Sequence, residues 1–264
     1  VLKSETSLKE EIQNNIDLFG VRTTFNSKIE KELLTITNSI NDKSVKNRTD
    51  FRKDKTFTID PDDAKDFDDA LSIKINNESI TVGIHIADVS HYIPANSEID
   101  KEASLRAFSV YFPGLVIPMI PEKLSNEICS LNPNEDKLCF SVVVKIDPRS
   151  YAVKSHWVGK TIINSNKRFT YNEAEKIIVE NIQSEFGSEI TMLDSIAKHL
   201  RKNRIKNGSI DFERRETSFI LNNDNEPIDV VDKPALSTHK LVEEFMLLAN
   251  KIVAQKLSKK LFSI

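Results

Sequence analysis

Hydrophobic residues recur along this chain with two different spacings, and together they predict a mixture of helices and strands. Apolar positions three and four residues apart are typical of one face of a helix, whereas alternating or unbroken apolar runs are typical of strands. The helical spacing predicts helices over 8–19, 27–41, 97–108, 122–130, 171–181, 188–206 and 238–257. The other pattern predicts strands within 56–94, over 138–146 and 151–163, and in the region 208–221. Prolines at 113, 118 and 121 predict a shaped loop over 109–121.

An acidic stretch lies between two of the predicted strand segments. Six aspartates fall within residues 60–69, and the apolar run Ala70-Leu71-Ser72-Ile73 follows them. Two unit charges about 4 Å apart repel by roughly 4 kcal/mol at an effective dielectric constant near 20. If these carboxylates pack together, then protonation, basic partners or a bound divalent cation must offset the repulsion.

Two interpretations of this acidic stretch stay open on the residues alone. An acidic run is often a solvated surface loop. The apolar flanks and Phe67 within the run favour a metal site instead, and all-oxygen ligands indicate magnesium or manganese rather than zinc. An EF-hand calcium loop is excluded, because no glycine makes its sharp turn and Leu71 occupies the position of the closing glutamate.

Composition is that of an ordinary soluble protein. The chain has 264 residues, 39 % hydrophobic and 29 % charged, which suffices for one large domain or two small ones. It has no apolar run of the roughly 18 residues that a membrane span needs, and no signal-peptide pattern. Cys129 and Cys139 lack zinc-type spacing, so we expect reduced, buried thiols, which suit a cytoplasmic protein. Because the chain begins at Val1 rather than at methionine, we expect a fragment.

Net charge by itself argues weakly against a nucleic-acid partner. The formal net charge is −3, whereas proteins that follow a phosphate backbone usually carry a basic excess. The charges are unevenly distributed, however, because basic residues gather late in the chain: Lys198, Arg201, Lys202, Arg204, Lys206, Arg214 and Arg215. This run is either a solvated helix face or a surface that contacts phosphates.

Four of the aspartates match a known signature. Residues 60–70 resemble the signature of the RNB catalytic domain of the ribonuclease II / ribonuclease R exoribonucleases. Its carboxylates are spaced D-x5-D-x-D-D, which is met by Asp60, Asp66, Asp68 and Asp69. Three further family segments are also met: I-A-D-V at 86–89, S-V-Y-F-P at 109–113, and L-S-N-x-x-C-S-L-x-P at 124–133. The resemblance extends from about residue 15 to the end of the chain.

The resemblance implies a fold, an activity and a set of site residues. The fold is an RNB-type α+β fold with a mixed, largely antiparallel sheet flanked by helices. The activity is processive 3′→5′ hydrolysis of single-stranded RNA from its 3′ end to 5′-mononucleotides, in which the four aspartates hold Mg²⁺ (Mn²⁺ is possible) in a two-metal mechanism. In the family pattern, Tyr111 would orient the terminal nucleotide, Phe212 would stack on a base, and Glu243 would approach the 3′ end.

The same resemblance predicts the domain organisation. Residues 1–25 correspond to the tail end of an N-terminal OB or cold-shock-type region, and residues 26–264 to the catalytic domain. The family's T-S-P-I-R-R-Y segment, whose arginine contacts the scissile phosphate, is not found in these 264 residues. We therefore expect a catalytic domain that is incomplete at its C-terminus and weakly active or inactive, because the transition state lacks a cationic partner.

Several alternatives stay open on the sequence. His85, in an apolar strand, is expected to be a satisfied core residue rather than a ligand. Glu243 is either a surface residue of the last helix or faces a polar cavity, and Ser237 is the expected cap of that helix. The functions that compete with RNA hydrolysis are RNA binding by an inactive protein of the same fold, and magnesium-dependent hydrolysis of small phosphate esters. No protein partner can be inferred.

Overall fold

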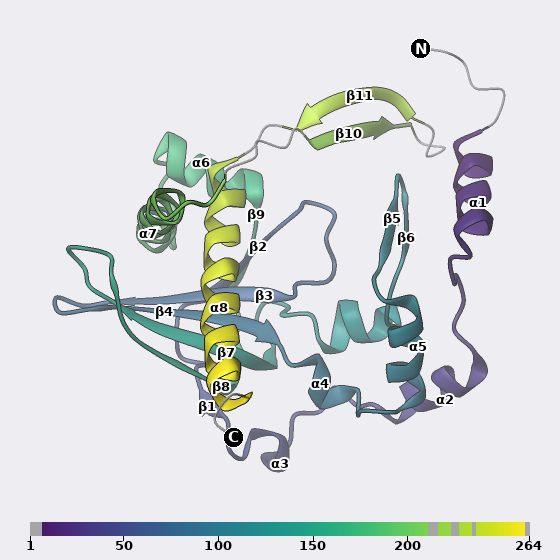
Figure 1. Cartoon of the computed structure of the whole chain (residues 1–264), viewed down its shortest axis with the longest axis horizontal. Helices are drawn as coiled ribbons and strands as arrows, with labels where there is room; N and C mark the ends of the chain where they lie inside the picture. Colours follow the sequence, from purple (N-terminus) through teal and green to yellow (C-terminus); the bar gives the residue numbers. More distant parts are fainter. Residues whose placement is uncertain (1–6, 211–215, 223–226, 234–235, 262–264) are drawn as a thin grey trace. The chain divides into compact units, whose positions relative to one another are not determined.

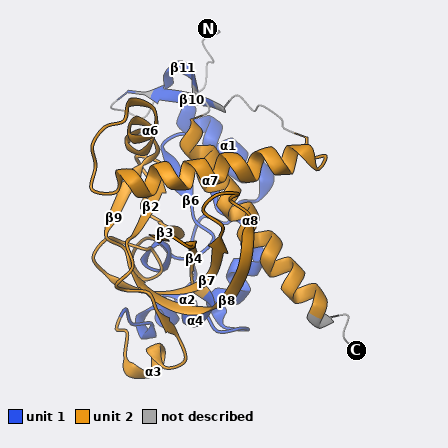
Figure 2. Ribbon diagram, turned by 90° about the vertical axis from the view of Figure 1, so that its left-hand side faces the viewer, with its two compact units in different colours: residues 1–38, 90–125, 213–235 blue, residues 39–89, 126–212, 236–264 orange. Residues whose placement is uncertain are grey.

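Two compact units make up the chain in a computed structural model (Figures 1 and 2). Unit 1 comprises residues 1–38, 90–125 and 213–235, and unit 2 comprises residues 39–89, 126–212 and 236–264. The acidic stretch belongs to unit 2 together with the large sheet, so unit 2 positions the candidate site. The predicted domain boundary at residue 26 stays a prediction.

The structure describes most of the chain. The described residues are 7–210, 216–222, 227–233 and 236–261. Within them, no helix is both long and apolar enough to cross a bilayer. Both cysteines are free and buried, as the sequence predicted.

Unit 1 consists of short helices and two hairpins. Its helices are α1 (Leu8–Phe19), α2 (Ser27–Thr35) and α5 (Glu98–Arg106). The hairpins pair β5 (Val110–Phe112) with β6 (Leu115–Ile117), and β10 (Glu216–Leu221) with β11 (Pro227–Lys233). The chain passes between the units at α4 (Val89–Tyr92) and at the π-helix η1 (Lys123–Ile128).

Unit 2 is built on a seven-stranded sheet with the order β1-β8-β7-β4-β3-β2-β9. The strands are β1 (Thr49–Asp50), β2 (Thr56–Asp60), β3 (Asp69–Ile75), β4 (Ile80–Ala87), β7 (Asp136–Ile146), β8 (Val153–Asn164) and β9 (Lys167–Thr170). The helices are α3 (Asp42–Val45), α6 (Tyr171–Glu180), α7 (Gly187–Lys206) and α8 (Ser237–Leu261). The four inner pairings are antiparallel and the two at the edges are parallel, which confirms the predicted mixed, largely antiparallel sheet.

The main core lies between one face of this sheet and the helices α6, α7 and α8. Leu71, Ile84 and Val142 occupy neighbouring positions of β3, β4 and β7 and are 3 % exposed or less. They form one cluster with apolar residues of the three helices, including Ile190 and Phe245. Figure 1 shows α8 crossing in front of the sheet, and α8 contacts β4 and β7. Burial of this face stabilises the framework around the site.

The opposite face of the sheet carries a buried row of hydrogen-bonded polar side chains. His85 Nε2 lies 2.8 Å from Ser72 Oγ, and His85 Nδ1 lies 2.7 Å from Ser141 Oγ. Ser141 Oγ lies 2.6 Å from Thr161 Oγ1, so the row joins β3, β4, β7 and β8. Burial lowers the pKa of His85 to about 3, which keeps the imidazole neutral. His85 is therefore a satisfied core residue, as expected.

Residues 109–121 differ from the predicted shaped loop, because they contain the β5–β6 hairpin. Gly114 has φ 73°, a conformation that glycine adopts without strain, and Pro113 stands beside it in the turn. The prolines lie at or outside the strand ends, where they remove no ladder hydrogen bond. The prediction was wrong because it treated them as strand breakers rather than as turn residues.

The predicted ends of several helices also need correction. The helix expected over 27–41 ends at Thr35, and the helix expected over 122–130 is the π-helix over 123–128. Ser237 is the first residue of α8 rather than its cap, and its hydroxyl donates to Glu175 Oε1 at 2.6 Å. This hydrogen bond joins α8 to α6, so the Ser237 side chain links two helices and does not cap one.

Gly83→Ala tests the tight packing of the polar row. A Cβ at position 83 would lie 2.5 Å from His85 Nε2 and even closer to Ser72 Oγ. We expect a loss of unfolding free energy of roughly 1–3 kcal/mol, because an added methyl group in a filled site forces its neighbours to move. Gly187→Ala is the control, since its nearest neighbour would lie 3.9 Å away. Urea denaturation measures both variants, and equal stability of the two would contradict the packing described.

Candidate functional site

The candidate site lies where β2 and β3 separate. Their pairing covers only Thr56 with Ser72 and Phe57 with Leu71. Asp60 is the last residue of β2 and Asp69 is the first residue of β3, and the two carboxyls are near enough for the charge of Asp60 to act on Asp69. Residues 61–68, which carry the other aspartates of the signature, connect the strands without being helix or strand themselves.

Ser130 and its neighbour hold the second half of this connection. The Phe67 N–H donates to Ser130 Oγ at 3.0 Å, and the Ser130 hydroxyl donates to the Lys65 carbonyl at 3.0 Å. The Leu131 N–H donates to the Phe67 carbonyl at 2.8 Å. The Ala87 N–H, at the end of β4, donates to the Asp68 carbonyl at 2.9 Å. These bonds fix the backbone on which Asp66 and Asp68 stand. The role of Ser130 was missed, although it lies in the matched segment 124–133.

Arg168 holds the first half of the connection from β9. Its Nη2 donates to the carbonyls of Pro61 and Asp62, the latter at 3.1 Å. Its guanidinium lies 5.6 Å from the centroid of the Phe67 ring. Residue 168 reaches the loop because β9 pairs in parallel with β2, opposite Thr58. No local pattern in the sequence signals this pairing, so Arg168 was missed.

The Asp60 and Asp69 carboxyls sit in an environment that disfavours their negative charge. Burial, followed by the charges of Asp60 and Asp68, raises the pKa of Asp69 to about 7. Burial also raises the pKa of Asp60 to about 6, with the charge of Arg168 opposing the rise. The charges of neighbouring aspartates therefore act on both carboxyls and disfavour their ionisation. The positive charge nearby does not fully compensate the negative charge of the site.

Asp66 and Asp68 lie in the connection between β2 and β3. Burial, followed by the charge of Asp66, raises the pKa of Asp68 to about 6. The Asp68 residue is nevertheless exposed, so solvent screens part of its charge. Asp66 is half-buried, and its negative charge raises the pKa values of both Asp60 and Asp68.

Unsatisfied polar atoms gather at this site. Thr58 Oγ1, Asp60 Oδ2 and Arg168 Nε are buried and form no hydrogen bond within the described part of the chain. Buried polar atoms are nearly always hydrogen-bonded, so such a group indicates a place for water, an ion or a ligand. An all-oxygen donor set with uncompensated negative charge fits a hard divalent cation.

The carboxylates do not form a ready-made ligand set. Among residues 7–210, 216–222, 227–233 and 236–261, no three His, Cys, Asp or Glu side chains lie close enough together to hold a metal ion. Asp60, Asp66, Asp68 and Asp69 thus fit a hard cation by donor chemistry and charge, and the metal assignment stays a prediction. Coordination would require their side chains to converge.

The residues predicted to hold RNA are distributed over the chain. Tyr111 is on β5 of unit 1, is 68 % exposed, and lies in a different compact unit from the aspartates. Phe212 lies outside the described residues. Glu243 on α8 is exposed, and its Oε1 lies 3.6 Å from Arg204 Nη2. Arg204 forms a closer ion pair with Glu244. The RNA-binding roles of all three stay predictions.

Glu244, rather than Glu243, is the buried glutamate of α8. Its side chain is 3 % exposed, and Arg204 on α7 donates to it from Nη2 at 2.6 Å. Arg201 Nη1 lies 3.8 Å from the same carboxylate. Part of the basic run on α7 therefore holds α8 in place. Of the two alternatives for Glu243, the structure has the exposed surface residue and not a residue that faces a polar cavity.

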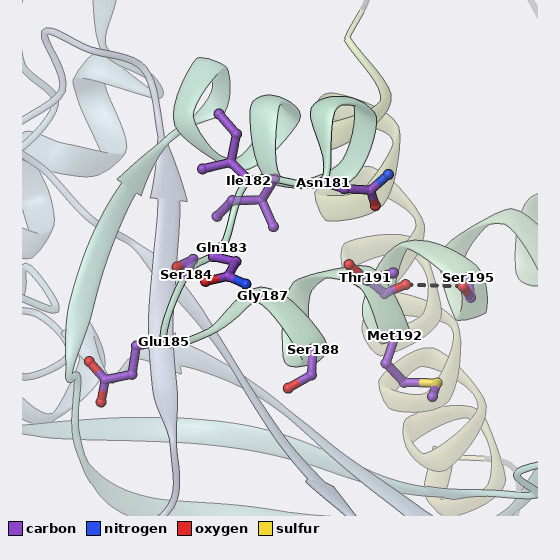
Figure 3. A pocket seen from close by; sticks show the side chains of 11 residues that line it. Asn181, Ile182, Gln183, Ser184, Glu185, Gly187, Ser188, Thr191, Met192 and Ser195 are labelled. Carbon is purple, nitrogen blue, oxygen red and sulfur yellow. Dashed lines mark hydrogen bonds between the residues drawn. The ribbon is translucent and has the colours of Figure 1, made fainter.

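A pocket between α6 and α7 is separate from the aspartates (Figure 3). It has a volume of about 690 Å³ and is lined by residues between Ile177 and Ser195. Thr191 and Ser195 are joined by a hydrogen bond of 3.0 Å within α7. The lining includes Glu185 as its single acidic residue, so this pocket offers no set of carboxylates comparable with the candidate site.

The chain belongs to the RNB domain family, which matches residues 48–263. This range contains the aspartates, Ser130 and Arg168. The family therefore covers the whole of the candidate site, and the resemblance stated from the sequence is confirmed.

Ribonuclease R proteins are among the relatives of this chain. Ribonuclease R of Aquifex aeolicus is 38 % identical over 242 residues, covering 89 % of this chain and 34 % of its own length. Ribonuclease R of Mycoplasmopsis pulmonis is 39 % identical over 230 residues, covering 86 % and 32 %. The chain thus spans about a third of the length of these relatives.

A solved structure has the same fold. It is Mycoplasma genitalium RNase R in complex with ribose-methylated single-stranded RNA, which aligns with a TM-score of 0.90 at 26 % identity. The alignment covers 100 % of this chain and 42 % of the other. The largely antiparallel sheet and its helices are therefore those of this family.

Asp69→Asn should stabilise the metal-free protein at neutral pH. The folded-state pKa of about 7 exceeds the ordinary 3.8, so the wild type loses stability as the pH rises from about 4 through 7. We expect a gain in unfolding free energy of at most about 4 kcal/mol at pH 8, and no gain below pH 4. Urea denaturation in chelator measures this, with exposed Asp63→Asn as the control. Destabilisation at pH 8, or a gain that does not depend on pH, would contradict the account.

Arg168→Met should loosen the connection over 61–68. The variant loses both hydrogen bonds to the Pro61 and Asp62 carbonyls but keeps an unbranched side chain. We expect amide hydrogen exchange over 62–67 to become roughly 10- to 150-fold faster, because a charge-assisted bond contributes about 1.5–3 kcal/mol. Exchange in β7 should not change. Lys167→Met is the control, and equal exchange in both variants would count against the role of Arg168.

Proposed function

We propose that this chain carries the metal-binding part of a 3′→5′ exoribonuclease that hydrolyses single-stranded RNA to 5′-mononucleotides. The observation that carries the proposal is the group of uncompensated carboxyls at the separated ends of β2 and β3. This group coincides with the four aspartates of the RNB signature, and the ribonuclease R relatives support the activity. The substrate is proposed to enter by its 3′ end, and the free thiols suit a cytoplasmic setting.

In this proposal, Asp60, Asp66, Asp68 and Asp69 would hold Mg²⁺, or Mn²⁺ in its place. A bound divalent cation supplies charge neutralisation for the phosphate and lowers the pKa of attacking water. The protein residues have other tasks. Arg168 and Ser130 hold the backbone of the aspartate connection, and the burial of Asp60 reduces screening of its carboxyl by bulk water. Tyr111, Phe212 and Glu243 are the proposed contacts to the RNA end.

A second candidate function is RNA binding without hydrolysis. The observation that favours it is the lack of three converging ligand side chains within the described residues. Fluorescence anisotropy with labelled oligo(A) measures binding, and release of mononucleotides measures turnover. Binding without turnover in Mg²⁺ or Mn²⁺ would favour this second function. Turnover of p-nitrophenyl phosphate without any dependence on RNA length would instead favour a small-molecule phosphatase.

Asp69→Asn is the direct test of the exoribonuclease proposal. We expect metal-dependent release of mononucleotides from labelled poly(A) to fall about 100-fold or more, because removal of one charge-stabilising group costs that much in comparable sites. Asp63→Asn, in the same connection but outside the signature, should keep the wild-type rate. Unchanged hydrolysis by Asp69→Asn, with RNA binding retained, would contradict the proposal.

A further inference from the structure

A row of four side chains crosses the sheet from the candidate site to β8. Asp69 on β3 pairs with Ile86 on β4, Ile86 pairs with Phe140 on β7, and Phe140 pairs with Lys160 on β8. Residues directly opposite each other on antiparallel strands project from the same face. At about 4.8 Å per strand, the backbone of Phe140 lies about 10 Å from that of Asp69, and the backbone of Lys160 about 14 Å.

This row is open to solvent, although its neighbours on the same face are not. Ile86 is 37 % exposed, Phe140 is 41 % exposed, and the Lys160 side chain is 51 % exposed. The adjacent rows are 8 % exposed or less: Leu71, Ile84, Val142 and Val158 on one side, and Leu138 and Ile162 on the other. An apolar pair that is exposed between two buried rows of the same face indicates a contact surface.

The far end of the row carries an excess of positive charge. Lys160 Nζ lies 3.7 Å from Asp88 Oδ2. That same oxygen already accepts a hydrogen bond of 2.6 Å from Arg48 Nη2, and the Arg48 and Asp88 side chains are each 2 % exposed. One carboxylate therefore faces two cations, of which Lys160 is the exposed one. This end of the row suits an anionic group.

The order of groups along the row matches the parts of a nucleotide chain. Carboxylates that suit a metal-bound phosphate stand at one end, an exposed aromatic ring next to an isoleucine stands in the middle, and a cation stands at the other end. Aromatic side chains bind single-stranded RNA by stacking on bases, and lysine side chains bind phosphates. A protein partner would have no comparable reason to alternate in this way beside the aspartates.

We propose that Ile86, Phe140 and Lys160 form a nucleotide-binding surface, here called the shelf, for the RNA strand whose scissile phosphate lies at Asp69. A base stacks on Phe140 against Ile86, and a phosphate further along the strand contacts Lys160. This inference rests on the proposed function, because the aspartates define where the reacting phosphate lies. The shelf gives the site affinity for RNA that does not depend on sequence, since every base has an aromatic face.

Binding of fluorescent oligo(A) tests the shelf, measured by anisotropy in an Asp66→Asn background that suppresses turnover. We expect Phe140→Ala to weaken binding roughly 5- to 150-fold. Lys160→Gln should lower the slope of log Kd against log salt concentration by about 0.7, the value for one phosphate contact to a single strand. Trp157→Leu is the control, because Trp157 is 42 % exposed on the opposite face of the same sheet. It should bind as the parent does.

An RNA that lacks bases separates stacking from charge. Abasic positions near the 3′ end should weaken binding to the parent protein but have little further effect on Phe140→Leu, since the ring they would lose is already gone. Phe140→Leu keeps the apolar cover of the sheet, and Lys160→Gln changes only an exposed side chain. These two variants carry the test if Phe140→Ala proves unstable by thermal unfolding.

The outcomes distinguish failure of the shelf from failure of the proposed function. Parent-like affinity in both Phe140 variants, with an unchanged salt slope in Lys160→Gln, overturns the shelf even where the wild type hydrolyses RNA. Loss of affinity in these variants supports the shelf even where the wild type releases no mononucleotides. Self-association that Phe140→Ala abolishes, with RNA binding unchanged, overturns the shelf because a second copy of the chain would then cover the row.

Discussion

Negative charge held at the separated ends of β2 and β3 is the constraint on which the rest of the site depends. Burial and mutual repulsion raise the pKa values of Asp60 and Asp69 well above the ordinary range of a carboxyl group. Such an arrangement is unfavourable for folding by itself, and a stable framework must hold it. The hydrogen bonds of Ser130 and Arg168 supply that framework, because they fix the backbone of the connection between the two aspartates.

The two faces of the sheet make different contacts. One face packs against α6, α7 and α8, and the other carries the hydrogen-bonded row through His85. β4 takes part in all of these arrangements, because His85 is in the polar row, Ile86 is in the shelf, and the Ala87 N–H holds the Asp68 carbonyl. A small displacement of this one strand would therefore disturb the framework, the shelf and the aspartate connection together.

The sequence predicted the strongly patterned elements well and the short or long-range features poorly. The apolar run at 80–89 became β4. The metal-binding role of the four aspartates came from the resemblance and stays a prediction. β9 was missed because four residues carry too little pattern, and Arg168 was missed with it. Glu244 was missed because its partner Arg204 lies on α7, 40 residues away. Local periodicity could not choose between two adjacent glutamates, and no pattern could have revealed that β2 and β3 separate before the aspartates.

The central claim is that the buried carboxyls carry uncompensated charge that a divalent cation relieves. The most direct measurement is an NMR titration of the aspartate carboxyl carbons, with and without Mg²⁺. Without metal, the account predicts a midpoint near pH 7 for Asp69 and near pH 6 for Asp60. With Mg²⁺, both midpoints should fall below the ordinary value of 3.8, because the cation favours the ionised form. Midpoints that lie near 3.8 without metal and do not move when Mg²⁺ is added would contradict it.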